Sequence, residues 1–212
     1  MSKTSSGLTS RSPVGGLTRP QSFRDARLFV IATEGSVTEP HYFSIFSDSV
    51  ISPLRSHRVR RLEILPSAGG SAPNHVIAAL DKYKTENQIV DGDELWLVID
   101  VDRWISRGLL PRVVREAKQK GYYLAISNPC FEAWLLYHYA EKLPENNAKM
   151  LADAKYHCGN TKKEFLLEPL IKRIKDAAKN AEADDPTPTG PWPRPRGSHV
   201  YRLIKKLLST GC

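Results

Sequence analysis

Three acidic side chains follow apolar segments of the sequence and are candidates for binding a divalent metal. Glu34 comes directly after the run Arg27–Thr33. Asp100 and Asp102 come directly after the run Glu94–Ile99. Both runs are typical of strands buried on both faces of a parallel sheet, and ligands gather beyond the carboxyl ends of such strands. If the two strands are neighbours, the three carboxylates converge, and a hard cation such as Mg²⁺ would offset their repulsion.

The residues around these acids each have a functional and a structural explanation. In an extended Asp-x-Asp segment both side chains lie on one side, so Asp100 and Asp102 could share metals, although a single Asp at a strand end is commonly a cap. Gly35 would allow a close approach of backbone or phosphate, or is simply a turn glycine. Glu132 would complete the site as ligand or base, or is favoured there by the helix dipole. Arg103 would stabilise the negative charge that builds up in the transition state of phosphate chemistry at such a site, or is an exposed neighbour or partner of Asp102.

The elements that must position these acids alternate between strand and helix. Strands are expected at 27–33, 60–65, 94–99 and 122–127, and helices are expected from about 38, after the Gly-rich segment 67–71, and at about 110–120. Four strands interleaved with three helices predict an α/β fold with a mostly parallel four-stranded sheet. The α/β core is therefore placed at residues 25–128, after a basic tail at 1–24 that is expected to be disordered.

The remainder of the chain, residues 129–212, is expected to be a helical extension with a Pro-rich loop at 184–197. Asn128-Pro129 is interpreted as a helix start, with Asn as the cap and Pro at the first position. A long helix is expected at about 162–181, and a basic amphipathic helix at about 198–208. His138 lies on an apolar helix face, which favours a buried, hydrogen-bonded histidine over a role at the site.

The charge of the chain favours a polyanionic partner, and nucleic acid first. Net charge is +8, and no acidic residue follows Asp185. Lys and Arg side chains attract phosphates and release their counterions, although a solvated surface is the alternative for each residue. The candidate phosphate-contacting residues form two groups, Arg55, Arg58, Arg60 and Arg61, and then Arg194, Arg196, Arg202, Lys205 and Lys206.

Composition also bears on the compartment. The three cysteines, Cys130, Cys158 and Cys212, form neither a disulfide framework nor a zinc pattern. No segment has the roughly 18 consecutive apolar residues that a membrane span needs, and the N-terminal residues do not resemble a signal peptide. A cytoplasmic protein without a membrane partner is the expectation.

Three motifs resemble the RloB-like proteins, which are encoded in bacterial restriction-modification and phage-defence loci. They are the segment Thr33–Gly35 (TEG) followed by Thr38–Phe43 (TEPHYF), the Asp-x-Asp at 100–102, and Ser127–Leu136 (SNPCFEAWLL) with His138 after it. The resemblance covers about residues 26–210, and a Pro/Arg insertion at 190–196 departs from the family's closing pattern. That family is similar in turn to Toprim domains, which hold Mg²⁺ through a Glu after one strand and a later Asp-x-Asp. By position, Glu34, Asp100 and Asp102 match those residues.

The resemblance implies an Mg²⁺-dependent nuclease of anti-phage defence, with Mn²⁺ as the alternative ion. Glu34, or a water that it orients, would serve as general base. The competing hypothesis is a non-catalytic module that binds nucleic acid or regulates an ATPase encoded beside it. A nucleotide phosphotransferase lacks support, because Gly69-Gly70 is not followed by the Lys-Ser/Thr of a phosphate-binding loop.

Overall fold

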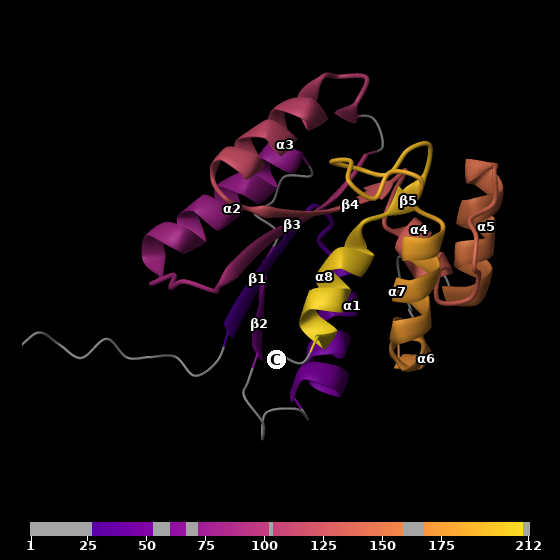
Figure 1. Ribbon diagram of the computed structural model, residues 1–212, viewed down its shortest axis with the longest axis horizontal. Coiled ribbons are helices and arrows are strands. Elements are labelled where there is room, and N and C mark those ends of the chain that lie inside the picture. The colour runs from indigo at the N-terminus through magenta and orange to yellow at the C-terminus, as the bar shows by residue number, and fades with distance from the viewer. Residues whose placement is uncertain (1–26, 53–59, 67–71, 102–103, 159–167, 210–212) are drawn as a thin grey trace, which may run out of the picture.

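The computed structural model describes residues 27–52, 60–66, 72–101, 104–158 and 168–209, and its centre is a five-stranded sheet (Figure 1). The strands are β1 (Arg27–Thr33), β2 (Arg60–Leu65), β3 (Glu94–Asp100), β4 (Tyr123–Asn128) and β5 (Gly197–Ser198). Their order is β2-β1-β3-β4-β5. The first four pair in parallel, as the alternation of elements predicts, and β5 pairs antiparallel with β4. The fold is therefore α/β with a mixed sheet.

Helices cover both faces of the sheet (Figure 1). They are α1 (Thr38–Phe46) with a π-helical continuation η1 (Ser47–Ile51), α2 (Pro73–Glu86), α3 (Leu109–Gln119), α4 (Glu132–Leu136), α5 (Asn147–Cys158), α6 (Glu168–Lys172), α7 (Ile174–Ala183) and α8 (Val200–Leu208). Helices α2 and α3 pack on one face, and α1, α4, α7 and α8 bury their apolar residues on the other. None of the described helices is both long enough and apolar enough to cross a lipid bilayer.

The side-chain alternation of β1 explains why both faces are covered. Phe29 and Ile31 belong to one core cluster, and Leu28, Val30 and Ala32 belong to the other. Successive side chains of a strand point to opposite faces, so a continuous apolar run needs an apolar layer on each side. All five side chains are almost fully buried. The apolar run therefore places the carboxyl end of β1 between two layers of helices.

The segment after β4 differs from its prediction. Asn128 is not a helix cap: it is the last residue of β4, it precedes a cis peptide bond to Pro129, and α4 begins only at Glu132. The Asn128 Nδ2 instead donates to the carbonyl oxygens of Pro193 at 2.8 Å and Pro195 at 2.7 Å. A side chain that is free to bond across the fold holds the Pro-rich loop against the end of β4.

Two further differences concern the helices of the C-terminal part. The helix expected at 162–181 is divided, because Arg173 lies between α6 and α7 with φ −102° and ψ 11°, and residues 162–167 lie outside the described part of the chain. Helix α5 was not predicted, since it buries only Met150, Ala154 and Cys158, which is a weak amphipathic pattern. The basic helix at the end of the chain is confirmed as α8, which begins at Val200.

Candidate carboxylate site

Glu34 and Asp100 meet at the carboxyl ends of neighbouring strands. β1 and β3 pair in parallel, with Thr33 opposite Val98. The backbone N–H of Glu34 donates to the Val98 carbonyl at 2.9 Å, and the backbone N–H of Asp100 donates to Glu34 Oε2 at 3.1 Å. The two strands are therefore neighbours, which is the condition under which the sequence predicts that these acids converge. Asp102 and Arg103, the other candidates on this segment, lie outside the described residues.

Trp104 fixes the second oxygen of Glu34. Its indole Nε1–H donates to Glu34 Oε1 at 2.8 Å. The Trp104 side chain is only 5% exposed and belongs to the core cluster under α2 and α3. Glu34 therefore accepts one hydrogen bond on each oxygen, and this pairing holds the carboxylate at the sheet edge. The sequence analysis did not single out Trp104. Its place two residues after the Asp-x-Asp is the one signal that could have identified it.

Glu39 is a fourth acid at this edge that sequence reasoning did not single out. It lies in the first turn of α1, is 6% exposed, and accepts the backbone N–H of Gly35 on Oε1 at 3.2 Å. A Cβ added at Gly35 would lie 2.1 Å from Glu39 Oε2, so only glycine leaves room for this carboxylate. Burial, followed by the nearby charges of Glu132 and Glu34, raises the pKa of Glu39 to about 7 against two backbone hydrogen bonds that lower it.

Asp100 lies where negative charge is unfavourable, because it is buried among other acids. Its backbone pairs with Ser127 on β4. Glu132, which follows β4, is one of the acids whose charge acts on Asp100. Burial raises the pKa of Asp100 well above its ordinary value, and the charges of Glu39, Glu34 and Glu132 raise it further. A backbone hydrogen bond from Phe131 opposes this only in part. Carboxylates that share a site cannot all be ionised cheaply, and a bound cation would relieve the strain.

Glu132 and Cys130 complete the group on the β4 side. Glu132 lies in the first turn of the helix after β4, as expected, although α4 begins later than predicted, and it is one of the charges that raise the pKa of Asp100. Burial raises the pKa of the half-buried Cys130 thiol, and the charges of Glu132 and Asp100 raise it further, so this thiol keeps its proton. Four carboxylates, Glu34 after β1, Glu39 in α1, Asp100 at the end of β3 and Glu132 at the start of α4, therefore lie near enough for their charges to act on one another. We call them the acid cluster.

The acid cluster is a concentration of negative charge and not a finished metal cage. Within the described ranges, no three His, Cys, Asp or Glu side chains lie together as they would around a metal ion. Glu34 is turned toward the Asp100 and Trp104 N–H groups, and Glu39 is turned toward Gly35. In the part of the chain that the structure describes, Asp100, Glu39 and Glu132 form no ion pair with Lys or Arg.

A protein-family model for the RloB-like proteins matches residues 29–207 of the 212-residue chain. The chain belongs to the RloB-like protein family. The matched region contains all four members of the acid cluster together with Trp104. Comparison with curated proteins and with solved structures gave no match.

The candidate phosphate-contacting residues of this RloB-like protein differ in how far they are engaged. Arg55 and Arg58 lie outside the described residues, Arg60 is the first residue of β2, and the exposed Arg61 lies 3.7 Å from Glu63. Near the C-terminus, Arg196 donates to the Pro144 carbonyl, Arg202 to the Pro188 carbonyl at 2.8 Å, Lys205 to Glu182 at 2.6 Å, and Lys206 to Glu94 at 2.9 Å. Arg194 is exposed and lies over the Trp192 ring at 4.7 Å.

The Lys206 contact has a structural role, because Glu94 is 1% exposed and also accepts from the Trp96 indole at 2.9 Å. His138 is likewise structural. It is 2% exposed, its Nε2 lies 3.1 Å from the Tyr42 hydroxyl, and its Nδ1 lies 3.1 Å from the Leu135 carbonyl. The expectation of a buried, hydrogen-bonded histidine is confirmed.

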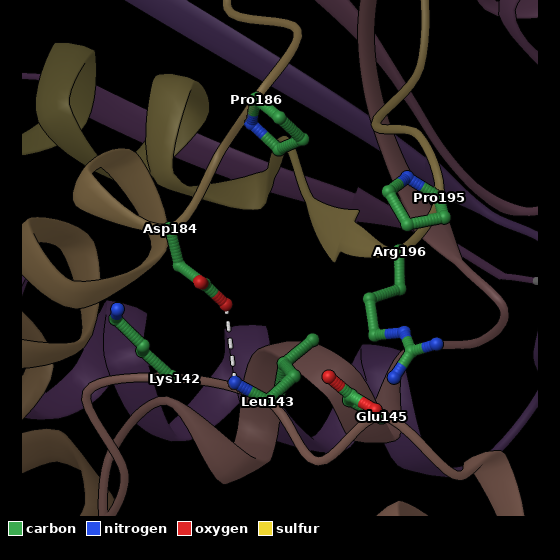
Figure 2. A pocket seen from close by; sticks show the side chains of 7 residues that line it. All are labelled: Lys142, Leu143, Glu145, Asp184, Pro186, Pro195 and Arg196. Atoms are coloured by element: carbon green, nitrogen blue, oxygen red, sulfur yellow. Dashed lines mark hydrogen bonds between the residues drawn. The ribbon is translucent and has the colours of Figure 1, made fainter.

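A cavity of about 520 Å³ lies apart from the acid cluster. Its lining comes from the segment after α4, the end of α7 and the Pro-rich loop, and contains no member of the acid cluster. Figure 2 shows Asp184 and Arg196 on opposite sides of it. Asp184 accepts the Leu143 N–H at 3.1 Å and the Tyr137 hydroxyl at 2.9 Å, so its carboxylate is occupied in holding the surrounding backbone.

Proposed function

We propose that this RloB-like protein is an Mg²⁺-dependent nuclease that hydrolyses nucleic-acid phosphodiesters, in the setting of bacterial anti-phage defence. The observation that carries the proposal is the meeting of Glu34 and Asp100 at the ends of neighbouring parallel strands, with the Asp100 N–H 3.1 Å from Glu34 Oε2. A Glu after the first strand and an Asp-x-Asp after a neighbouring strand resemble the metal-holding residues of Toprim domains.

The donor chemistry of the acid cluster fits Mg²⁺, with Mn²⁺ as the alternative. Mg²⁺ prefers carboxylate oxygens, and the acid cluster brings together the charges of four carboxylates from separate parts of the fold. The raised pKa values of Asp100 and Glu39 show that negative charge is unfavourable at this edge, and a bound cation would offset it. Glu34, Asp100 and Asp102 would hold the ion, and Glu132, whose charge raises the pKa of Asp100, would act as a further ligand or base.

In this proposal the residues of the chain position the reacting groups, while bound Mg²⁺ would lower the pKa of an attacking water and neutralise charge on the scissile phosphate. Glu34 is held by the Asp100 and Trp104 N–H groups, which suits it to orient a water or accept its proton. Gly35 has no Cβ and therefore leaves room for the Glu39 carboxylate beside its backbone. Arg103 stays a prediction as the group that stabilises transition-state charge.

The test is metal-dependent cleavage of single-stranded RNA and DNA by the purified chain. Asp100→Asn and Glu34→Gln should each reduce cleavage by about 100-fold or more, as expected when a group that acts on the transition state is removed. Glu86→Gln is the control, since Glu86 is an exposed α2 residue whose partner, 3.9 Å away, is Lys82. Cleavage at the control rate by both site variants would reject the catalytic assignment.

One observation keeps a second function in view, namely a non-catalytic module that binds nucleic acid or regulates an ATPase. Within the described residues the acids accept protein N–H donors and do not form a ready metal cage. A structural acid cluster would have the same appearance. Oligonucleotide binding that weakens with salt, without cleavage in Mg²⁺ or Mn²⁺, would favour this second function.

A further inference from the structure

Two exposed arginines each lie over a buried tryptophan ring of the core cluster under α2 and α3. The Arg107 guanidinium is 5.5 Å from the centre of the Trp104 ring, and the Arg194 guanidinium is 4.7 Å from the centre of the Trp192 ring. Trp104 and Trp192 are 5% and 6% exposed and belong to the same core cluster. A guanidinium that rests on an aromatic face loses conformational freedom. Its N–H groups lie in the plane of the guanidinium itself and can still donate to a ligand.

The first pair is attached to the β1–β3 side of the acid cluster. Trp104 donates its indole N–H to Glu34 at 2.8 Å, so the ring beneath Arg107 touches the cluster directly. Arg107 follows in the turn before α3, and Gly108 ends that turn with a φ of +65°. The turn is closed by the Gly108 N–H, which donates to the Ile105 carbonyl at 2.9 Å.

The second pair is attached to the β4 side of the same edge. Asn128 follows Ser127, the residue that pairs with Asp100, and its side chain binds the carbonyls of both Pro193 and Pro195. Arg194 lies between these two prolines, and Figure 1 shows its loop beside the end of β4. Arg107 is therefore linked to Glu34 through Trp104, and Arg194 is linked through Asn128 to the end of β4, the strand that pairs with β3 beside Asp100.

The charge of these two arginines is not cancelled by a carboxylate in the described part of the chain. Neither forms an ion pair there, whereas Lys205 and Lys206 pair with Glu182 and Glu94. A phosphodiester backbone approaching four carboxylates is repelled unless fixed cations attract it on either side. Two immobilised guanidinium groups beside the acid cluster would supply that attraction, and the planar fork of Arg matches phosphate oxygens.

We propose that Arg107 and Arg194 form a clamp that grips two backbone phosphates of a nucleic-acid strand, one on each side of the acid cluster, so that the strand crosses it. The clamp rests on the proposed function for its substrate class, but it requires only binding and no cleavage. It assigns recognition to two residues from distant parts of the sequence.

The experiment measures binding of a fluorescent single-stranded oligonucleotide by anisotropy, in EDTA, as a function of salt. Arg107→Gln and Arg194→Gln should each weaken binding by about 10-fold at low salt, the size of one lost charge-assisted hydrogen bond. Each should also reduce the slope of log K against log salt by about 0.7, and the double variant by about 1.4. The Lys variants at both positions should retain the slope, because they retain the charge.

Arg173→Gln is the matched control, since Arg173 is also an exposed arginine over an aromatic ring, 5.0 Å from the centre of Tyr139, but it packs beside the other core cluster. It should bind like the wild type. An unchanged salt slope in the double variant, or a wild-type chain that binds no oligonucleotide, would overturn the clamp. Binding that is lost in the double variant while the wild type fails to cleave would support the clamp and count against the nuclease alone.

Discussion

The hydrogen bond from Trp104 to Glu34 can be isolated by comparing two tryptophans of the same core cluster. Trp104→Phe removes the Nε1–H that lies 2.8 Å from Glu34 Oε1 and keeps an aromatic ring in place. Trp192→Phe removes a similar ring area from a side chain of similar exposure. The Trp192 Nε1 is buried without a hydrogen-bond partner among the described residues, so this second variant loses no such bond.

The two variants should therefore differ in stability by the value of one hydrogen bond to a charged group. Such bonds contribute about 1.5–3 kcal/mol, while the loss of ring area is common to both variants and cancels. For a chain of this length, 1 kcal/mol moves the melting temperature by about 2–4 °C, so Trp104→Phe should melt about 3–12 °C below Trp192→Phe. The reason is that Glu34 loses a fixed donor in a partly buried site.

The same comparison should separate the two variants in metal binding. Groups that orient a metal-holding carboxylate typically change affinity by about 10- to 100-fold when removed. Calorimetric titration with Mn²⁺ should therefore show that Trp104→Phe binds more weakly by this factor, and that Trp192→Phe binds like the wild type. Circular dichroism melting provides the stability half of the test without any metal.

Equal melting temperatures for the two variants would refute the claim that the indole N–H stabilises Glu34. Equal Mn²⁺ affinities, with a clear difference in melting temperature, would mean that the bond stabilises the fold but does not orient a metal ligand. In that case the role assigned to Glu34 in the nuclease proposal would fail, while the geometry of the sheet edge would stand.

Two further predictions concern Gly35 and His138. Gly35→Ala places a Cβ 2.1 Å from Glu39 Oε2 and must displace that carboxylate. We expect cleavage to fall about 10- to 100-fold, with little change in melting temperature because the displaced group is the end of a flexible side chain. Wild-type cleavage by this variant would contradict a role for Glu39. Burial lowers the pKa of His138 from 6.5 to about 4, so the stability that this residue contributes is complete above pH 6.5 and is lost as the pH falls toward 4. Between pH 7.5 and 5 the loss is about 2 kcal/mol, and the free energy of unfolding in urea should fall by that much less in His138→Gln than in the wild type. His75→Gln, at an exposed position on α2, is the control, and its free energy of unfolding should change with pH as in the wild type. The same pH dependence in His138→Gln would contradict the burial argument.

The sequence determined the elements whose patterns are local. The apolar runs before Glu34 and Asp100 predicted β1 and β3, because a strand buried on both faces needs consecutive apolar residues. The parallel direction of the first four strands followed from the alternation of strands with helices, but their order in the sheet did not. The sequence predicted the convergence of Glu34 with Asp100 only on the condition that these two strands are neighbours, and the sheet meets that condition.

Only the tertiary structure decided which other residues meet those two acids. Trp104 reaches Glu34 across 70 positions of the chain, and Asn128 reaches the Pro-rich loop across 65, distances over which no local pattern carries information. Asn128-Pro129 has the local pattern of a helix start, but long-range hydrogen bonds to the prolines outweigh a cap. Glu39 lies in the acid cluster because α1 packs on the sheet and its carboxylate accepts the Gly35 N–H. The two-residue strand β5 exists only through its pairing with β4. Local patterns thus placed Glu34 and Asp100 at the ends of strands, and long-range packing brought those ends together and chose the groups that surround them.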